Sequence, residues 1–507
     1  MPRVRAPDRV LTFAQLLEQA QRLAACLADL GVGKGDTVAL LLPNCSAFIV
    51  AHYALARMGA VIAPVNAQLK SRLLREALEL TEAACVVTTA AFEGPLHALS
   101  PRPSALRFTV TVNESADPEG EIAVSEPSAT GFERSGPPRA WKELSAGDPR
   151  SEVGPHDPAI LFTTSGTTGK PKGILVTHHQ AVVGITAWLP RWRYDQDTAC
   201  IMVAPYFHVI YNPLIIGAHL CLGRAVVLGN LQARAAAREV ERTRATAISG
   251  SPALLIQLLS DRMIAERDLS SLRAIIFGTA PTPVPIIQGL RRRLPAATLY
   301  NCYGLTETCT AVSCLGSDQM EGRETSVGQP FSCVETSIRD PEHRELPRGE
   351  IGELYLRGPH VIKSYYKAPE ANATRFHDGW LRTGDIGYFD QDSFLYLLGR
   401  SDDMINVGGE KIYPRDIENV LYKHPGVFDA AVVAVEDAAR GQVVKAFVVP
   451  SEGHTLDLAS LRQLCIKSLP PAFVPRSYEI VAELPRTPVG KVLRRELARG
   501  ASGPKDR

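Results

Sequence analysis

Between Thr163 and Gly173 the chain places hydroxyl side chains, three glycines and two lysines within eleven residues. These residues follow directly on the apolar run 159–162, which has the composition of a buried strand. A strand that ends in such a loop presents backbone N–H groups, hydroxyls and ammonium charge to one small volume, which suits a tri- or pyrophosphate. Glycine also lets the backbone approach an anion closely. The sequence therefore predicts a phosphate-binding loop made of Thr163, Thr164, Ser165, Gly166, Thr167, Thr168, Gly169, Lys170 and Lys172.

Two other interpretations of this loop fit less well. A Walker A loop that starts at Gly166 requires glycine at position 171, and Pro171 stands there. A flexible linker is also rich in glycine, serine and threonine, but two lysines and a proline directly behind an apolar strand are unusual for one. We therefore favour the phosphate loop.

The segment from Ser165 to Gly173 resembles the phosphate loop of the adenylate-forming superfamily. That superfamily comprises acyl-CoA synthetases, adenylation domains of nonribosomal peptide synthetases and firefly luciferases. Further motifs follow in the order of the family, at Tyr303-Gly304-Leu305-Thr306-Glu307, Thr383-Gly384-Asp385, Gly399-Arg400-Ser401-Asp402-Asp403 and Pro488-Val489-Gly490-Lys491. The resemblance extends from Leu11 to about Leu497, and it implies that the protein uses ATP, Mg²⁺ and coenzyme A.

Lys491 is the catalytic residue that the resemblance places at the reacting groups. Joining a carboxylate to the α-phosphate of ATP brings two anions together, so the site must neutralise both of them and the crowded transition state. Without the resemblance, Lys491 reads as a solvated lysine that starts the last helix. With it, Lys491 matches the family's lysine that bridges the substrate carboxylate and the α-phosphate.

Other motif residues match the family's nucleotide and metal contacts. Glu307, beside Thr306, is the expected Mg²⁺ ligand, because this ion prefers carboxylate together with phosphate oxygens. Tyr303 offers a flat face to adenine and Asn301 an amide for its amino group. Asp385 suits the ribose hydroxyls and Arg400 can reach ribose or phosphate oxygens, although without the motifs the two read as a surface pair. The expected nucleotide site also includes Thr279, Ala280, Cys302 and Gly304, and many relatives have glycine or serine at the position of Thr279.

The expected acyl pocket is lined by His208, Val209, Ala280 and Gly304. His208 matches the family's aromatic or histidine gate, although a lone histidine on an apolar face is more often a core residue. Relatives that activate amino acids carry an aspartate here, so Phe207-His208 argues against an α-amino acid substrate. Small residues at 280 and 304 leave room for a medium-chain, aromatic or bulky alicyclic acid.

A second half-reaction, attack of a thiol on the adenylate, requires another arrangement of the same domains. In relatives the C-terminal domain rotates about a hinge at the position of Asp402. Gly408 and Gly409 then match a loop along the pantetheine tunnel, where the backbone must pass a narrow chain. Arg440 and Phe473 are the candidate contacts to the CoA nucleotide.

Composition excludes several classes of protein. With 507 residues, 45% hydrophobic and 21% charged, the chain reads as a globular protein of two or more domains. A net charge of +1 without a dense basic cluster argues against nucleic acid as a partner. The longest apolar region, 209–229, is interrupted by polar residues and should not span a membrane, and no secretory signal is evident. Ten cysteines without a Cys-x-x-Cys pair favour a reducing cytoplasm.

Hydrophobic periodicity predicts a layered α/β fold. We expect helices over 14–30 and 46–58, strands over 37–42, 60–64, 199–204, 224–228, 245–249 and 273–278, and a solvated loop over 113–140. Short strands at 351–357 and 394–398 predict a small β subdomain. A final unit should contain strands at 430–435 and 443–449 and helices at 458–469 and 490–499.

These elements predict an α/β protein with a large N-terminal domain of several subdomains and a small mobile α+β C-terminal domain. The expected boundaries are 1–399 for the N-terminal domain, 400–402 for the hinge, 403–499 for the C-terminal lid and 500–507 for a disordered tail.

We expect an acid–thiol ligase that makes acyl-CoA from a free carboxylic acid. Three alternatives stay open: transfer of the acyl group to a carrier protein, an enzyme that retains only thioester formation, and a non-catalytic ligand sensor. A homodimer is also left open.

Overall fold

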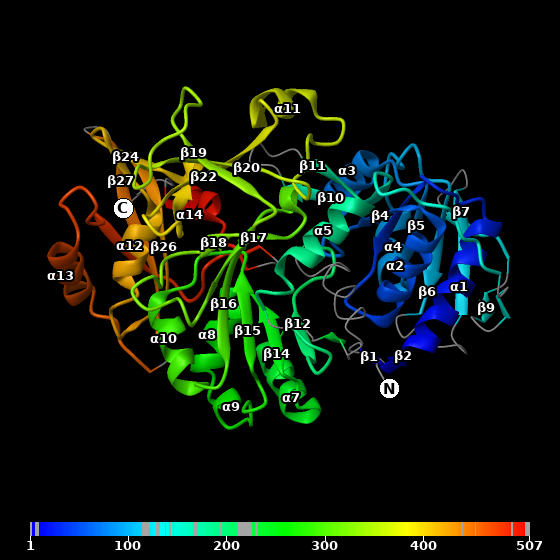
Figure 1. The fold of residues 1–507 in the computed structure, drawn as a ribbon, viewed down its shortest axis with the longest axis horizontal. Helices are drawn as coiled ribbons and strands as arrows, with labels where there is room; N and C mark the ends of the chain where they lie inside the picture. The colour runs from blue at the N-terminus through cyan, green and yellow to red at the C-terminus, as the bar shows by residue number, and fades with distance from the viewer. Residues whose placement is uncertain are drawn as a thin grey trace.

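The computed structural model describes residues 3–5, 10–113, 121–127, 132–136, 138–140, 143–144, 147–165, 171–192, 194–209, 226–228, 232–437, 440–451, 453–487 and 490–501. These residues form four β-sheets with helices packed against them (Figure 1). Three sheets are built from the chain up to Arg400, and the fourth is built from the chain after it. The predicted α/β class and its small final unit are therefore confirmed.

The first sheet carries the predicted phosphate loop at its edge. Its order is β11 (Pro171–Thr177), β10 (Pro158–Ser165), β4 (Val61–Pro64), β3 (Thr37–Leu41), β5 (Cys85–Thr88), β6 (Phe108–Val112), β7 (Glu121–Pro127) and β8 (Phe132–Arg134). Four helices accompany these strands: α1 (Phe13–Asp29), α2 (Ser46–Met58), α3 (Ser71–Thr81) and α4 (Ala90–His97). Helix α1 begins where Thr12 accepts a hydrogen bond from the amide of Gln15 at 3.2 Å.

The expectation of a loop over 113–140 is wrong for the described part of that segment. Strand β7 pairs antiparallel with β6, and both β8 and β9 (Arg139–Ala140) pair with β7. The sequence contains few large aliphatic residues there, but Ala123 and Ser125 alternate with more exposed neighbours and face the interior. Pairing with an existing sheet edge supplies the order that composition alone does not indicate.

The second sheet contains the parallel strands whose ends form the site. Its order is β18 (Gln329–Pro330), β17 (Ala311–Gly316), β16 (Thr298–Gly304), β15 (Ala274–Gly278), β14 (Ala247–Gly250), β12 (Cys200–Val203), β13 (Val226–Leu228), β1 (Arg3–Arg5) and β2 (Val10–Thr12). The helices of this region are α5 (His178–Trp188), α7 (Ala233–Thr243), α8 (Pro252–Ser260), α9 (Arg262–Ala265) and α10 (Val284–Arg293). Strands β14, β15 and β16 run parallel, so their carboxyl ends meet at one edge, where ligands bind in sheets of this kind.

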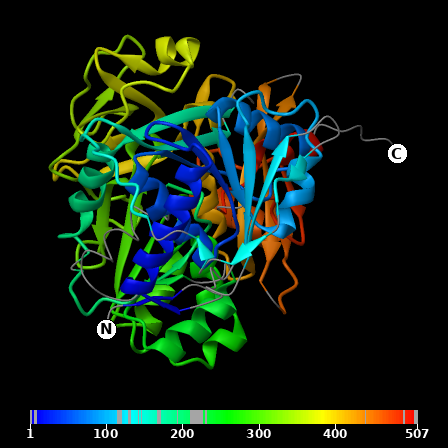
Figure 2. The same ribbon diagram turned by 90° about the vertical axis from the view of Figure 1, so that its right-hand side faces the viewer.

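A third, smaller sheet confirms the predicted β subdomain. It comprises β19 (Glu335–Arg339), β20 (Gly352–Arg357), β21 (Phe376–His377), β22 (Trp380–Phe389) and β23 (Leu395–Arg400), with helix α11 (Pro369–Arg375) beside them. Figure 2 shows this yellow part and the green helices α7 to α10 at opposite ends of the molecule.

The fourth sheet forms the final unit. It comprises β24 (Ile405–Val407), β25 (Glu410–Ile412), β26 (Val427–Asp437), β27 (Gly441–Pro450) and β28 (Ser477–Ile480), with helices α12 (Pro414–Leu421), α13 (Leu458–Ser468) and α14 (Arg494–Ala501). The last helix begins at Arg494 and not at position 490 as predicted, because Gly490 has a φ of +86°, outside the helical region.

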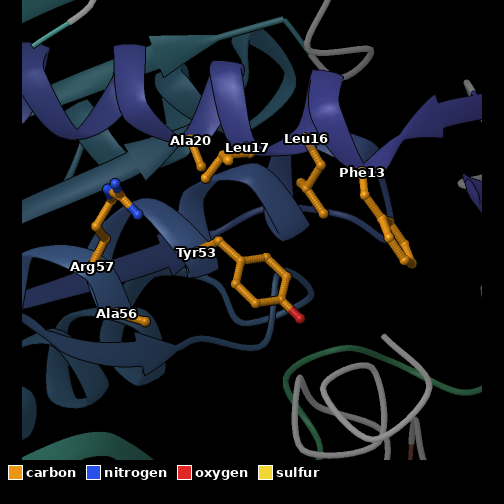
Figure 3. A pocket seen from close by; sticks show the side chains of 7 residues that line it. All are labelled: Phe13, Leu16, Leu17, Ala20, Tyr53, Ala56 and Arg57. Carbon is orange, nitrogen blue, oxygen red and sulfur yellow. The ribbon is translucent and has the colours of Figure 1, made fainter. Parts of the chain in front are cut away.

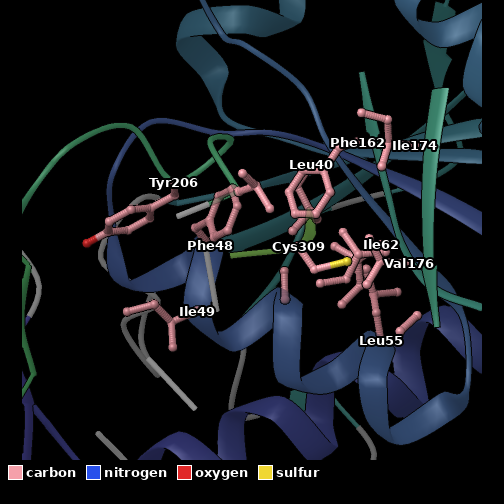
Figure 4. Packing of buried hydrophobic residues seen from close by; sticks show 14 of the residues in the cluster. Leu40, Phe48, Ile49, Leu55, Ile62, Phe162, Ile174, Val176, Tyr206 and Cys309 are labelled. Atoms are coloured by element: carbon pink, nitrogen blue, oxygen red, sulfur yellow. The ribbon is translucent and has the colours of Figure 1, made fainter. Parts of the chain in front are cut away.

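The largest hydrophobic cluster fixes the strands that lead to the phosphate loop. Phe162 of β10 and Ile174 and Val176 of β11 pack with Leu40, Ile62 and residues of α2 (Figure 4). All of these side chains are almost fully removed from solvent. The hairpin is therefore anchored by its apolar face, while its tip is left for polar residues. Across the part of the chain that the structure describes, no helix is both long and apolar enough to cross a membrane.

Candidate active site

Two cavities stand out, and only one of them has groups that can do chemistry. The first, of about 350 Å³, lies between α1 and α2 (Figure 3). Its lining is mostly apolar, and its one charged residue, Arg57, is paired with Asp148. Besides this paired arginine, the Tyr53 hydroxyl is the polar side-chain group in its lining.

The second cavity, of about 290 Å³, lies between the carboxyl ends of the second sheet and the final unit. Nine of its lining residues were predicted from the sequence: Thr279, Ala280, Asn301, Cys302, Tyr303, Gly304, Asp385, Arg400 and Lys491. Residues more than 200 positions apart are thus brought to one space.

The predicted phosphate loop joins β10 to β11. The two strands stay paired up to Thr164 opposite Lys172 and Ser165 opposite Pro171. Residues 166–170, and with them the predicted Gly166, Thr167, Thr168, Gly169 and Lys170, lie outside the described residues. The side chains of Thr163, Thr164 and Lys172 are half-buried at the end of the hairpin.

Lys172 lies among charged groups of the predicted site. Its Nζ lies 5.0 Å from the centre of the Tyr365 ring. Burial lowers the pKa of Lys172, the charge of Arg375 lowers it further, and the carboxylate of Glu307 opposes both. An anion bound here would meet positive charge from the hairpin.

Tyr303, Asp385 and Arg400 form one hydrogen-bonded group. The Tyr303 hydroxyl donates to Oδ2 of Asp385 at 2.5 Å, and Nη1 of Arg400 donates to Oδ1 at 3.2 Å. Asp385 and Arg400 are partners in the register of β22 and β23. Because Asp385 is only 7% exposed, the reading of these two as a surface pair is excluded.

The adenine-side residues show one unexpected conformation. Asn301 donates from Nδ2 to the Ser326 carbonyl oxygen at 2.9 Å, so its Oδ1 is the atom suited to accept from an adenine amino group. Thr279 has a φ of +70°, which is a genuine outlier for a β-branched residue. Its hydroxyl is buried and has no partner among the described residues.

Glu307 is oriented by a residue that the sequence did not single out. The Tyr365 hydroxyl donates to Oε1 of Glu307 at 2.7 Å. Glu307 and the half-buried Thr306 lie in the short helix η2 (Thr306–Thr308), directly after β16. In the described residues, no three histidines, cysteines or carboxylates form a cluster that could hold a metal ion. That Glu307 binds Mg²⁺ together with phosphate oxygens, the ligands that this ion prefers, stays a prediction.

Lys491 enters the cavity from the loop before α14. Its side chain keeps solvent contact because it projects into the open space. The surrounding protein lowers the pKa of Lys491 by desolvation, and the carboxylates of Asp385 and Glu307 oppose this effect. Burial, and then the charge of Lys491, lower the pKa of His208 from 6.5 to about 3, so His208 is neutral near pH 7.

The acyl side of the cavity differs from one expectation. Gly304 and Ala280 line the cavity and Val209 is buried. However, a Cβ built on Gly304 would lie 2.3 Å from the carbonyl oxygen of Thr310. A side chain at 304 would therefore collide with β17 and could not project into an acyl cavity.

The predicted hinge and CoA residues do not line this cavity, although Asp402 stands between Arg400 and Asp403, which do. Asp402 is exposed in the short helix η3 (Ser401–Asp403). Gly408 and Gly409 form the turn between β24 and β25 with φ of +60° and +97°, which favours glycine. Gly408 N–H donates to the Arg440 carbonyl oxygen at 3.4 Å, so these residues are neighbours. Phe473 packs against the core of the final unit.

Sequence reasoning missed the residues that support the motifs. Tyr365 orients Glu307, Arg375 adds positive charge near Lys172, and Arg486 contacts the loop of Lys491. Arg486 lies next to a recognised motif, so its proximity was the only available signal. Nothing in the sequence around Tyr365 indicates its partner.

Comparisons with known proteins agree over nearly the whole chain. A model of the AMP-binding enzyme family matches residues 2–366, and a model of the AMP-binding enzyme C-terminal domain matches residues 416–491. The long-chain-fatty-acid–CoA ligase of Bacillus subtilis (strain 168) is 30% identical over 96% of this chain and 89% of its own length. The feruloyl-CoA synthase of an Amycolatopsis species is 32% identical over 98% of this chain and 95% of its own length.

Solved structures show the same fold. The o-succinylbenzoate CoA synthetase of Bacillus subtilis, in complex with its acyl-adenylate intermediate, has a TM-score of 0.82 and 28% identity over 100% of this chain and 95% of that chain. The same protein has been solved with ATP and a magnesium ion. An amide bond synthetase from Marinactinospora thermotolerans has a TM-score of 0.86 and 29% identity over 99% of this chain and 97% of that chain.

Proposed function

Since this chain belongs to the AMP-binding enzyme family, as an AMP-forming acyl-CoA synthetase, we propose that it activates a carboxylic acid without an α-amino group. The acid is first joined to AMP and then transferred to the thiol of coenzyme A. The observation that carries this proposal is the meeting of Lys491 with Tyr303, Asp385 and Arg400 around one cavity.

In the first half-reaction a carboxylate oxygen attacks the α-phosphorus of ATP, and the bond to pyrophosphate breaks. The Lys491 ammonium neutralises the two oxygens that approach each other, where charge builds up in the transition state. Lys172 and the hairpin hold the departing phosphates. Bound Mg²⁺ supplies further neutralisation of phosphate charge, and Glu307 is its protein ligand.

The nucleotide is held by groups that are already oriented. Asp385 accepts hydrogen bonds from Tyr303 and Arg400, so its carboxylate is fixed before any ribose arrives. Tyr303, pinned by its hydroxyl, presents its ring to adenine. Thr279, Ala280, Asn301, Cys302 and Gly304 complete the adenine side of the cavity.

In the second half-reaction the thiolate of CoA attacks the acyl carbonyl and AMP leaves. The final unit turns about Asp402 and brings Gly408 and Gly409 to the pantetheine, with Arg440 and Phe473 at the CoA nucleotide. The open space beside Gly408 and Gly409 supports this assignment, because a Cβ there would meet no atom within 4 Å in the present arrangement.

The proposal also names the molecule that accepts the acyl group. Coenzyme A is favoured because the curated relatives are named CoA ligases or synthetases. The pantetheine thiol of a carrier protein is an alternative acceptor, because it would attack the acyl-adenylate in the same way. An amine is a further alternative, since one similar structure is an amide bond synthetase.

The proposal further concerns the class of carboxylic acid that the enzyme activates. His208, neutral and beside Lys491, replaces the carboxylate that would hold an α-ammonium group. The relatives are named for long-chain fatty, feruloyl, coumarate and indoleacetate substrates, so they span both aliphatic and aromatic acids. A medium-chain, aromatic or alicyclic acid remains our proposal.

The test is a panel of acids that begins with ferulate, 4-coumarate, indoleacetate, 2-succinylbenzoate, octanoate and palmitate. Pyrophosphate release is measured with ATP and Mg²⁺, and products are identified by mass with CoA, a pantetheinylated carrier protein or an amine as acceptor. We expect acyl-CoA from at least one acid. The Lys491→Ala variant should lose about 10²–10³-fold in acyl-adenylate formation and retain transfer from a supplied adenylate. Equal loss of both half-reactions would contradict the role of Lys491.

A further inference from the structure

In its described residues, the loop that carries Lys491 contains no helix or strand, and its two sides are paired by an isolated β-bridge between Arg486 and Val492. It lies between β28 and α14, and its ends are joined by two short contacts. Thr487 N–H donates to the Lys491 carbonyl oxygen at 2.8 Å, and Lys491 N–H donates to Thr487 Oγ1 at 3.1 Å. These contacts close the loop. Its two ends are attached to the final unit by apolar packing, because Leu484 and Val492 pack with strands β26 and β27.

Arg486 adds a polar attachment at the peptide next to Lys491. Its Nη1 donates to the carbonyl oxygen of Gly490 at 2.6 Å, which is the peptide directly before Lys491. Its Nη2 donates to Oδ2 of Asp429 in β26 at 2.5 Å. One planar guanidinium therefore joins the loop to a core strand through two different donors, which a lysine with a single nitrogen cannot reproduce.

Asp429 is a rigid anchor for this contact. Its side chain is 9% exposed, and its other oxygen, Oδ1, accepts from the Tyr422 hydroxyl at 2.7 Å. Both carboxylate oxygens are thus engaged. A carboxylate held on both sides leaves the guanidinium little freedom to shift.

The opposite side of the same peptide meets the N-terminal part of the chain. A Cβ built on Gly490 would lie 3.1 Å from Oγ of Ser251, the residue before α8. Gly490 therefore has both Arg486 and Ser251 as neighbours. A displacement on the Arg486 side moves the Cα from which the lysine side chain extends.

We infer that Arg486 is a positioning residue for acyl-adenylate formation, which acts through Gly490 on Lys491 and is itself anchored by Asp429. This inference rests on the proposed role of Lys491. A displacement of about 1 Å at a reacting group can cost on the order of 10²-fold in rate, so a residue outside the chemistry can have a large effect.

The experiment compares the two half-reactions in the full-length enzyme. Pyrophosphate exchange is measured with the best acid of the panel, and thioester formation is measured from the synthetic acyl-adenylate of that acid. For Arg486→Ala we expect kcat of exchange to fall about tenfold to 10²-fold, KM for ATP to stay nearly constant, and thioester formation to be retained. Arg486→Lys should recover part of the exchange rate.

Two further variants make the result specific. Asp429→Asn should reduce exchange in the same direction, and the double variant should lose less than the sum of the single effects, because the two residues act as one unit. Glu479→Gln is the matched control, since it breaks the Lys445–Glu479 ion pair of the same sheet without touching the loop. The control should leave exchange unchanged.

The outcomes separate this inference from the proposed function. If Lys491→Ala leaves exchange intact, the assignment of Lys491 fails. If Lys491→Ala loses exchange but Arg486→Ala does not, the positioning role of Arg486 is overturned alone. Equal loss of both half-reactions in Arg486→Ala, with a lower melting temperature and no recovery by lysine, would assign Arg486 to domain stability and also overturn it.

Discussion

The hydroxyl of Tyr365 donates a 2.7 Å hydrogen bond to Oε1 of Glu307, across 58 residues of sequence. The same ring lies under Nζ of Lys172, 5.0 Å from its centre. One tyrosine thus touches both the proposed metal ligand and a lysine of the phosphate hairpin. Burial, and then the carboxylate of Glu307, raise the pKa of Tyr365, so the hydroxyl keeps its proton and remains a donor.

Replacing this tyrosine tests the metal assignment. In Tyr365→Phe the Glu307 carboxylate loses its orienting donor, and loss of such an outer partner typically costs about 10–100-fold in metal affinity or activity. We expect pyrophosphate exchange to require more Mg²⁺ for half-maximal rate. Tyr366→Phe is the matched control, because Tyr366 donates to Glu82 on the surface. An unchanged Mg²⁺ dependence in Tyr365→Phe would contradict the assignment of Glu307 as the metal ligand.

Arg415 provides a test of the rotation between the two half-reactions. It lies on α12, and it donates to the carbonyl oxygens of Leu397 at 2.5 Å and Thr325 at 2.9 Å, both before the hinge. These hydrogen bonds join the final unit to the preceding part of the chain, and they would have to break in the rotation that we propose. In Arg415→Ala we expect adenylate formation to slow and thioester formation from a supplied adenylate to be equal or faster.

The rates of both half-reactions are measured under single-turnover conditions. Arg462→Ala, which removes an exposed arginine from α13 of the same unit, should change neither rate. A slower thioester step in Arg415→Ala would contradict the assignment of Arg415 to the first orientation.

Thr279 should show opposite effects on stability and activity. A side chain held in a sparsely populated backbone region costs about 1–3 kcal/mol. Glycine adopts φ near +70° without this cost, although it adds about 0.4–1 kcal/mol of entropy to the unfolded chain. We therefore expect Thr279→Gly to raise the melting temperature and to raise KM for ATP, since the buried hydroxyl at the cavity is removed.

Two companion variants separate backbone strain from the hydroxyl. Thr279→Ser keeps the hydroxyl and should keep KM for ATP. Thr279→Val keeps the strained backbone and removes the hydroxyl, so it should raise KM without a gain in melting temperature. A normal KM for ATP in the valine variant would show that the Thr279 hydroxyl does not contribute to ATP binding.

The loss of folding stability at acid pH should depend in part on His360. This side chain is fully buried, and burial lowers its pKa from 6.5 to about 4. Between these values the unfolded chain binds a proton that the folded chain does not, so stability is lost as pH falls from about 6.5 towards 4. We expect His360→Asn to reduce the loss of melting temperature between pH 7 and pH 5, measured as a difference from wild type. An identical pH dependence in both proteins would show that His360 does not titrate in this window.

The sequence predicted the buried strands well, because continuous apolar runs such as 274–278 leave few alternatives. It failed for β7, where pairing with β6 compensates for a weak hydrophobic pattern. It placed the start of the last helix at 490, four residues early, because Gly490 and Lys491 are compatible with a helix until their tertiary contacts are known.

For the site residues, too, the sequence revealed local patterns but not contacts between distant residues. Motif residues such as Asp385 and Lys491 were found because a known family places them. Their supporting residues depend on contacts between distant parts of the chain, 57 residues for Arg486 with Asp429 and 90 for Arg415 with Thr325. Local sequence carries no signal for such pairs. A larger side chain at position 304 cannot serve as a probe of acyl length, because its Cβ would already collide with the backbone at Thr310 and Ala311.

The distribution of the site between the sheet edges and the loop at Lys491 has a consequence for the gene. Every proposed contact to adenine, ribose and metal is encoded before codon 401, whereas the lysine that we propose accelerates the reaction is encoded about ninety codons later. The residues proposed to contact adenine, ribose and metal are therefore encoded in a different segment of the gene from the residue proposed to accelerate turnover. Changes in the last fifth of the gene therefore leave the proposed adenine, ribose and metal contacts in place, although this segment also contributes lining residues such as Arg415 and Lys491 to the cavity.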